Sequence, residues 1–238
     1  MQSTLSDVAP DPIILVDVAD IPGGGQLQLL RCGDAFSIHF GSDELMGSMV
    51  RDSEQALATL VCERLLACDA RGDGPAAVLI GGLGMGFTLG AALGALPSTA
   101  TVVVAELVPK VETWARGPLA HIFGDHLSDQ RLSLEIRDVH DVIDDASARF
   151  DAIMLDVDNG PDGLIHIPNE RLYCNWGLRA AHSALKPHGV LAIWSAYTDA
   201  AFVERLEKAG FDVEEVSMQA NPGDDDRQNI IWLASRRG

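Results

Sequence analysis

Residues 76–93, "AAVLIGGLGMGFTLGAAL", run from an apolar stretch into spaced glycines and then into alanines and leucines. The apolar stretch predicts a buried strand, and the alanine- and leucine-rich end predicts a helix. Gly82, Gly84 and Gly86 lie at the junction, where bare backbone can turn sharply and let a ligand approach its N–H groups. The segment therefore indicates the first strand, turn and helix of a nucleotide-binding sheet. Close packing of the helix on the strand also favours glycine, and this alternative stays open.

The chain after residue 75 alternates short apolar runs with helical patterns. Further strands are expected at "TVVVAEL" (101–107), "RLSLEIRD" (131–138), "FDAIMLDVD" (150–158) and "GVLAIWSA" (189–196). Continuous apolar strands are typical of parallel sheets covered by helices on both faces, so we expect a doubly wound, mostly parallel α/β sheet. One helix is expected to end at Lys186, before Pro187 and Gly189. Two final strands, at 209–218 and 228–236, should form an antiparallel hairpin.

The N-terminal part of the chain follows a different pattern. Strand-like pieces at 12–21, 25–33 and 35–41 are joined by the turn-forming sequences "PGGG" and "CGD". We therefore predict a small β-meander over residues 1–50. Leucines at helical spacing from Asp52 to Ala70 predict a helix that links the meander to the sheet. Residues 51–238 would then form a Rossmann-like adenosyl-binding domain that includes this helix.

Composition limits the classes of protein to consider. A chain of 238 residues can bury a sizeable core as one domain, with or without a small appendage. The formal net charge of −18 disfavours binding to nucleic acid or to an anionic membrane. The chain shows neither a signal peptide nor an apolar run long enough to span a bilayer, so we expect a cytoplasmic protein. The cysteines and the seven histidines are too scattered to predict a metal site.

Acidic residues end three of the expected strands, and parallel strands end at one edge of a sheet. Glu106 follows the last glycine of the turn by about 20 residues, where a carboxylate can accept both ribose hydroxyls. Asp138 could accept the exocyclic amine of an adenine, although it could also cap the helix that follows. Asp156 would lie nearest the ligand atom at which a reaction takes place. There it could orient an amine substrate or accept a proton from it. Its alternative role is in a turn, for which this sequence is also well suited.

Three further residues are candidates for contact with the acceptor substrate. Asp158 and Asn159 follow Asp156 at the same strand end. Tyr173 lies in "HIPNERLYCNWGL" (166–178) and could form a wall of the pocket. A core or surface contact near a helix start is an equally good interpretation of Tyr173.

Taken together, these motifs resemble the class I S-adenosylmethionine-dependent methyltransferase fold and, more closely, the spermidine synthase (polyamine aminopropyltransferase) family. The resemblance rests on the meander, "VLIGGLGMG", "VVVAELVPKVETWAR", the Asp138 motif, "FDAIMLDVDNGP" and "LKPHGVLAIWS". It implies a homodimer that binds S-adenosylmethionine or its decarboxylated form. It also implies a ribose role for Glu106, an adenine edge at Asp138 and Val139, and a catalytic carboxylate at Asp156.

The sequence departs from that family at positions that handle polyamines. Gly84 stands where aminopropyltransferases carry an Asp that holds the primary amine of decarboxylated S-adenosylmethionine. The residues 56–58, Ala-Leu-Ala, replace a Tyr-His-Glu stretch, and Asn159 replaces the second Asp of the D-S-S-D motif. Binding of the adenosyl group is therefore expected, whereas aminopropyl transfer loses support.

The leading hypothesis is an S-adenosylmethionine-dependent transferase that methylates a small molecule, an amine being one candidate acceptor. Aminopropyl transfer from decarboxylated S-adenosylmethionine to a polyamine is the first alternative. A catalytically silent adenosyl-binding protein, acting as a sensor or partner subunit, is the second. A dinucleotide dehydrogenase is disfavoured because the acidic strand ends fit an adenosyl-sulfonium site better.

Overall fold

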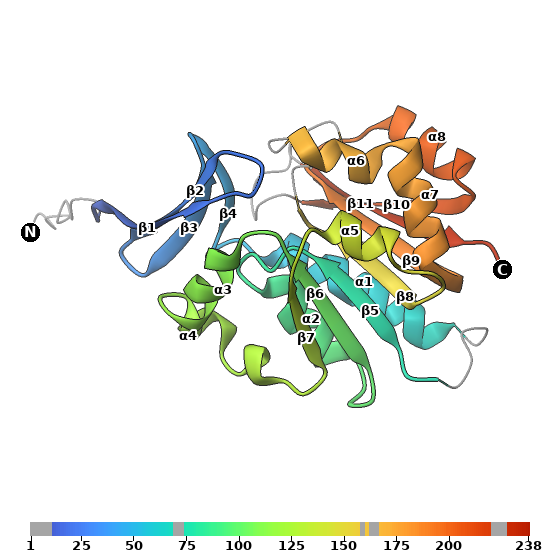
Figure 1. Ribbon diagram of the computed structural model, residues 1–238, viewed down its shortest axis with the longest axis horizontal. Coiled ribbons are helices and arrows are strands. Elements are labelled where there is room, and N and C mark those ends of the chain that lie inside the picture. Colours follow the sequence, from blue (N-terminus) through green and yellow to red (C-terminus); the bar gives the residue numbers. More distant parts are fainter. Residues whose placement is uncertain (1–10, 69–73, 158–159, 162–166, 220–227) are drawn as a thin grey trace, which may run out of the picture.

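The computed structural model of the chain describes residues 11–68, 74–157, 160–161, 167–219 and 228–238. In this part of the chain, a seven-stranded sheet carries helices on both faces, and a separate four-stranded sheet lies at one end (Figure 1). The strands of the large sheet are β5 (Ala77–Gly81), β6 (Thr101–Glu106), β7 (Leu132–Ile136), β8 (Phe150–Leu155), β9 (Leu185–Ser195), β10 (Phe211–Gln219) and β11 (Gln228–Arg236). The α-helices are α1 (Asp52–Ala67), α2 (Phe87–Ala95), α3 (Pro109–Arg116), α4 (Ala120–Phe123), α5 (Val139–Asp144), α6 (Glu170–Tyr173), α7 (Asn175–Ala184) and α8 (Ala200–Lys208). Within the described ranges, no helix is both long and apolar enough to cross a bilayer.

The large sheet has the order β10-β11-β9-β8-β5-β6-β7. Strands β5 to β9 are parallel to their neighbours among themselves, while β11 runs antiparallel to both β9 and β10. The predicted doubly wound, mostly parallel sheet and its C-terminal hairpin are therefore confirmed. From β5 the chain proceeds outward through β6 and β7, then returns to build β8 and β9 on the other side. The switch point, where such sheets bind ligands, lies between β5 and β8.

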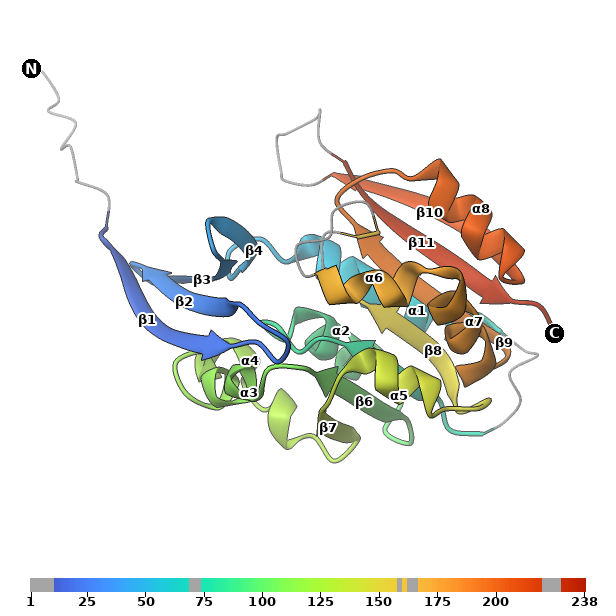
Figure 2. The same ribbon diagram turned by 45° about the horizontal axis from the view of Figure 1, so that its top comes forward.

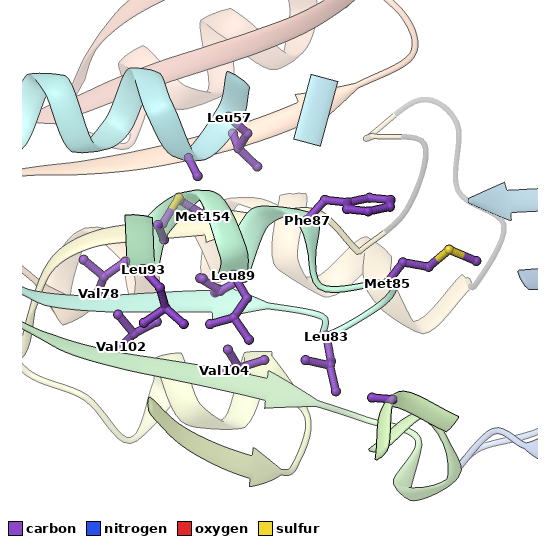
Figure 3. Packing of buried hydrophobic residues seen from close by; sticks show 14 of the residues in the cluster. Leu57, Val78, Leu83, Met85, Phe87, Leu89, Leu93, Val102, Val104 and Met154 are labelled. Carbon is purple, nitrogen blue, oxygen red and sulfur yellow. The ribbon is translucent and has the colours of Figure 1, made fainter. Parts of the chain in front are cut away.

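Two apolar cores hold the helices on the sheet. On one face, α1, α2 and α3 contribute buried side chains to a core shared with the meander. On the other face, α5, α7 and α8 pack over the second core. Figure 3 shows how Leu89 and Leu93 of α2 reach toward Val102 and Val104 of the neighbouring strand. This packing fixes α2, and with it the turn that connects α2 to β5.

The N-terminal sheet is the predicted β-meander, with strands β1 (Ile13–Asp20), β2 (Gln26–Cys32), β3 (Ala35–Phe40) and β4 (Asp43–Gly47). All neighbouring pairs are antiparallel. The fourth strand extends the meander beyond the three strand-like pieces that the sequence suggested. Figures 1 and 2 both show the meander beside α3 and α4. Asp17 of β1 secures this contact because it accepts a hydrogen bond from Trp114 Nε1 at 2.9 Å and pairs with Lys110 at 3.2 Å.

One predicted boundary was wrong. The helix expected to reach Lys186 ends at Ala184, and Leu185 already belongs to β9, where it pairs with Phe150 of β8. Pro187 and Gly189 therefore lie within the strand and do not separate it from the helix. The register of the β8–β9 pair shifts after Phe150, and His188 has a positive φ of 64°. This irregularity lets the strand pass through residues that normally interrupt one.

Candidate active site

The glycine turn leads from β5 into α2 with three residues in left-handed conformations. Gly82, Gly84 and Gly86 have φ values of +86°, +49° and +78°, which side chains rarely tolerate. A Cβ at Gly86 would lie 2.3 Å from the ring of Phe123, a buried core residue. Gly86 is thus required by packing of the turn against α4, whereas the alternative left open from the sequence was packing of the helix on the strand.

The other two glycines bring backbone against the strands on either side of the turn. A Cβ at Gly82 would lie 3.0 Å from the carbonyl oxygen of Asp156, so this glycine permits close approach to the end of β8. A Cβ at Gly84 would lie 2.7 Å from the Sδ atom of Met46 in β4. Gly84 therefore faces the meander, and its backbone lies directly against the side chain of Met46.

A cavity of about 130 Å³ lies between the meander and the carboxyl edge of the large sheet. The meander contributes apolar groups: Ile21, Leu27, Ile38, Leu45 and Met46. The sheet side contributes Gly82, Gly84, Ala105, Glu106, Leu107, Val108, Val111, Asp138, Val139, Asp156, Val157 and Asn169. The structure thus brings Gly82, Gly84, Glu106, Asp138, Val139 and Asp156, predicted separately from the sequence, to one cavity at the switch point.

Glu106 is buried at the end of β6, where its carboxylate joins two loops. Its Oε2 accepts a hydrogen bond from the N–H of Leu83 at 2.8 Å, and Oε1 accepts one from Val108 at 2.8 Å. Burial raises the pKa of Glu106, while the main-chain N–H groups act in the opposite direction. Each carboxylate oxygen has a second lone pair, so both can still accept a hydroxyl from a ligand. That Glu106 binds the ribose hydroxyls of a ligand stays a prediction. The two main-chain hydrogen bonds hold its carboxylate in a fixed position.

Asp138 is the N-cap of α5, the alternative weighed from the sequence. Its Oδ1 accepts a hydrogen bond from the N–H of His140 at 2.9 Å. Its Oδ2 forms an ion pair with Arg171 of α6. Asp138 and the neighbouring Val139 both line the cavity, so contact with adenine stays a prediction. An adenine amine would have to share the carboxylate with Arg171.

Asp156 follows β8 directly and meets the glycine turn from the opposite side to Glu106. Its Oδ2 accepts a hydrogen bond from the hydroxyl of Thr88 in the first turn of α2 at 3.0 Å. Burial raises the pKa of Asp156 to about 7, and the negative charge of Glu54 on α1 adds to this rise. A carboxyl group with such a pKa exists in both protonation states near neutral pH and is suited to proton transfer.

Tyr173 does not line the cavity in the described structure. Tyr173 is buried in the second core, where its ring meets Phe202 edge-on at a centroid distance of 5.9 Å. Its interpretation as a pocket wall is therefore replaced by the core contact. Asp158 and Asn159 lie outside the described residues, and their role at the substrate stays a prediction.

The comparisons with known proteins concern the fold of the chain. No protein-family model matches the chain, and no curated protein sequence matches it. The spermidine synthase from Thermotoga maritima matches with a TM-score of 0.71 and 16% identity, over 93% of this chain and 72% of that chain. A spermidine synthase in complex with the transition state analogue AdoDATO gives 0.73 and 17%, over 93% and 73%. The chain has the fold of the spermidine synthases.

The same fold occurs in a methyltransferase. The 1,6-didemethyltoxoflavin-N1-methyltransferase from Burkholderia thailandensis, with bound 1,6-didemethyltoxoflavin and S-adenosylhomocysteine, matches with a TM-score of 0.54 and 21% identity. That match covers 79% of this chain and 80% of the methyltransferase. At these identities the likeness concerns the fold, and the chemistry of the site has to be argued from its residues.

Sequence reasoning did not predict three residues of the site: Met46, Glu54 and Thr88. Each lies beside the glycine turn, Met46 from β4, Glu54 from the first turn of α1 and Thr88 from the first turn of α2. The helical pattern of α1 was visible, but an acid in a first helical turn is ordinarily explained by the helix dipole. Thr88 could have been found, since it lies two residues after Gly86 at the helix start.

Proposed function

We propose that the protein is an S-adenosylmethionine-dependent transferase that methylates a small molecule. The observation that carries the proposal is the single cavity at the switch point, around which Glu106, the glycine turn and Asp156 converge. Apolar side chains from the meander cover the cavity, as a site that must exclude water requires. The fold shared with spermidine synthases and a methyltransferase supports the same class of reaction.

The residues present fit an adenosyl compound. Gly84 lines the cavity and carries no side chain, so a ligand in the cavity can approach the main chain there. Glu106 would accept the ribose hydroxyls, and Val139 would offer an apolar contact to the base. S-adenosylmethionine, when bound, supplies an electrophilic methyl group on a sulfonium. Asp156 would orient the acceptor and receive its proton, because proton transfer needs a base whose pKa is near the working pH.

The preference for methyl transfer over aminopropyl transfer is supported by Gly84. An acid at this position would repel the carboxylate of intact S-adenosylmethionine and pair with the bare amine of the decarboxylated compound. Glycine removes both effects, and the main-chain N–H groups at the start of α2 suit an anion. Aminopropyl transfer remains a second candidate because Glu54 supplies a carboxylate beside the same turn. The higher TM-scores of the spermidine synthases also favour it.

Paired calorimetric titrations test the proposal. We expect intact S-adenosylmethionine to bind more tightly than the decarboxylated form by at least about tenfold, or about 1.4 kcal/mol. Tighter binding of the decarboxylated form would replace methyl transfer with aminopropyl transfer. Glu106→Gln, which keeps the shape of the side chain, should weaken both ligands by about 1.5 to 3 kcal/mol. Glu63→Gln on the exposed face of α1 is the control. Failure of both ligands to bind the wild-type protein would overturn the proposal.

A further inference from the structure

Glu54 and Asp156 line a second, smaller cavity that adjoins the first. Its volume is about 20 Å³, and its wall includes the glycine turn and Thr88. Gly82, Gly84 and Asp156 line both cavities, so the two lie next to each other along the turn. A space of this size holds one water molecule or one small functional group, for which Glu54, Thr88 and Asp156 offer polar contacts.

Thr88 lies between the carboxylate of Asp156 and the backbone of Glu54. Its hydroxyl donates to Asp156 Oδ2 at 3.0 Å and lies 3.4 Å from the main-chain oxygen of Glu54. The carboxylate of Glu54 accepts a hydrogen bond from the hydroxyl of Ser53 at 2.8 Å. Within the described residues, neither Glu54 nor Asp156 forms an ion pair with a Lys, Arg or His. No described cation therefore offsets their negative charge.

The other charged groups around the two cavities do not offset the negative charge of Glu54 and Asp156. Asp52, in the same helical turn, adds negative charge next to Glu54. Glu106 lines the larger cavity and is buried, and Asp138 is already paired with Arg171. The end of the cavity near Asp156 is thus the part where negative charge is least compensated among the described residues.

Two carboxyl groups in this position resist full ionisation. Burial raises the pKa of Glu54, and burial together with the charge of Glu54 raises that of Asp156. Acids that interact in this way titrate as a pair, and one of the two keeps its proton to a higher pH than an isolated acid does. A positive charge brought into the cavity would favour the ionised pair and release that proton.

We propose that Glu54 and Asp156 together distinguish S-adenosylmethionine from S-adenosylhomocysteine, by releasing a shared proton to solvent when the cationic sulfonium binds and keeping it when the neutral thioether binds. This inference rests on the proposed function. Loss of the methyl group removes the positive charge, so the proton that Asp156 receives from the acceptor stays on the pair and the attraction of the pair for the ligand falls. The pair thereby assists exchange of spent for fresh cofactor.

The order of the strand ends supports this position for the sulfur. Along the edge of the sheet, Asp138 follows β7, Glu106 ends β6, the glycine turn follows β5 and Asp156 follows β8. A nucleoside held in the half of the cavity formed by Asp138 and Glu106 has its sulfur-bearing chain directed along the turn. Among the described residues, Asp156 and Glu54 are the charged side chains at that end.

Calorimetry in buffers with different ionisation enthalpies measures the protons exchanged on binding, without any acceptor substrate. S-adenosylmethionine and S-adenosylhomocysteine carry the same amino-acid end, so the comparison isolates the sulfonium charge. At pH 7 we expect S-adenosylmethionine to release about half a proton per protein molecule and S-adenosylhomocysteine to release almost none. The reason is that a pKa of about 7 leaves Asp156 protonated in half of the unliganded molecules. The affinity ratio of the two ligands should rise about tenfold between pH 6 and pH 8.

Glu54→Gln and Asp156→Asn each remove one member of the pair while keeping its shape. Both should abolish the difference in proton release and flatten the affinity ratio, whereas Glu63→Gln, exposed on the same helix, should leave both unchanged. Equal proton release with the two ligands, or a difference that survives in Glu54→Gln, would overturn the inference but leave the proposed function intact. Binding of neither ligand would overturn the proposed function and the inference together.

Discussion

The buried acid at the end of β8 should make the stability of this protein depend on pH in a way that one substitution removes. Asp156 has a pKa of about 7 in the folded protein, against an ordinary value of 3.8 that applies to the unfolded chain. Between these values the folded state holds a proton that the unfolded state has released. The free energy of unfolding therefore falls as pH rises through this window and levels off above pH 7.

The size of the effect follows from the shift. The full difference of about 3 pKa units corresponds to an upper limit of about 4 kcal/mol at about 1.36 kcal/mol per unit. Between pH 5 and pH 8 the share of this one group is about 2.5 kcal/mol. For a chain of this length, that amounts to a change in Tm of about 5 to 10 °C.

Asp156→Asn should remove this contribution because asparagine does not titrate and can still accept the hydrogen bond from Thr88. Urea unfolding of the wild type and the variant, followed at half-unit steps from pH 5 to pH 8, gives the difference directly. We expect the variant to gain stability relative to the wild type as pH rises, by about 2.5 kcal/mol over the range. Asp144→Asn, an exposed acid of α5, removes the same formal charge and should leave the slope unchanged. Parallel curves for Asp156→Asn and the wild type would refute the reasoning.

Two further predictions concern stability and use urea unfolding at pH 7. Gly86→Ala should destabilise the protein by about 2 to 5 kcal/mol, because it combines a left-handed backbone with a clash in the core. Gly94→Ala in the same helix has open space and should instead stabilise by about 0.4 to 1 kcal/mol, so equal effects would contradict this account. Lys186→Met should cost about 1.5 to 3 kcal/mol, because Asp151, which is 2% exposed, loses a charged partner at 2.8 Å. Lys208→Met, which breaks an exposed pair, should cost less than about 0.5 kcal/mol, and a similar loss in both would leave the burial argument unsupported.

The fold was predictable because each of its signals is local. A buried parallel strand is apolar along its whole length, and the glycine turn marks where the first such strand gives way to a helix. The acids Glu106, Asp138 and Asp156 could be assigned to one edge because parallel strands all end there. The order of the strands and the position of the meander over that edge depend on packing between distant segments. Neither the strand order nor the position of the meander could therefore be predicted from local sequence patterns.

The position of Glu54 at the site could not be predicted from the sequence. Glu54 precedes Asp156 by about a hundred residues, and nothing in its own neighbourhood distinguishes it from an ordinary solvated acid at a helix start. Only the packing of α1 against α2 brings its carboxylate to the glycine turn. The boundary at Ala184 failed for a related reason, since pairing of Leu185 with β8 outweighed the local preference of Pro187 and Gly189.

The three glycines show that a glycine-rich turn is weak evidence of ligand binding until its surroundings are known. Gly86 is needed because Phe123 lies beneath it, and Gly82 is needed because the end of β8 lies beside it. Both requirements come from folding and would be the same without any ligand. Of the three, only Gly84 lies against the far end of a flexible side chain, that of Met46, and not against backbone or a core ring. It is therefore the position at which a substitution would alter ligand preference at the least cost to the packing of the fold.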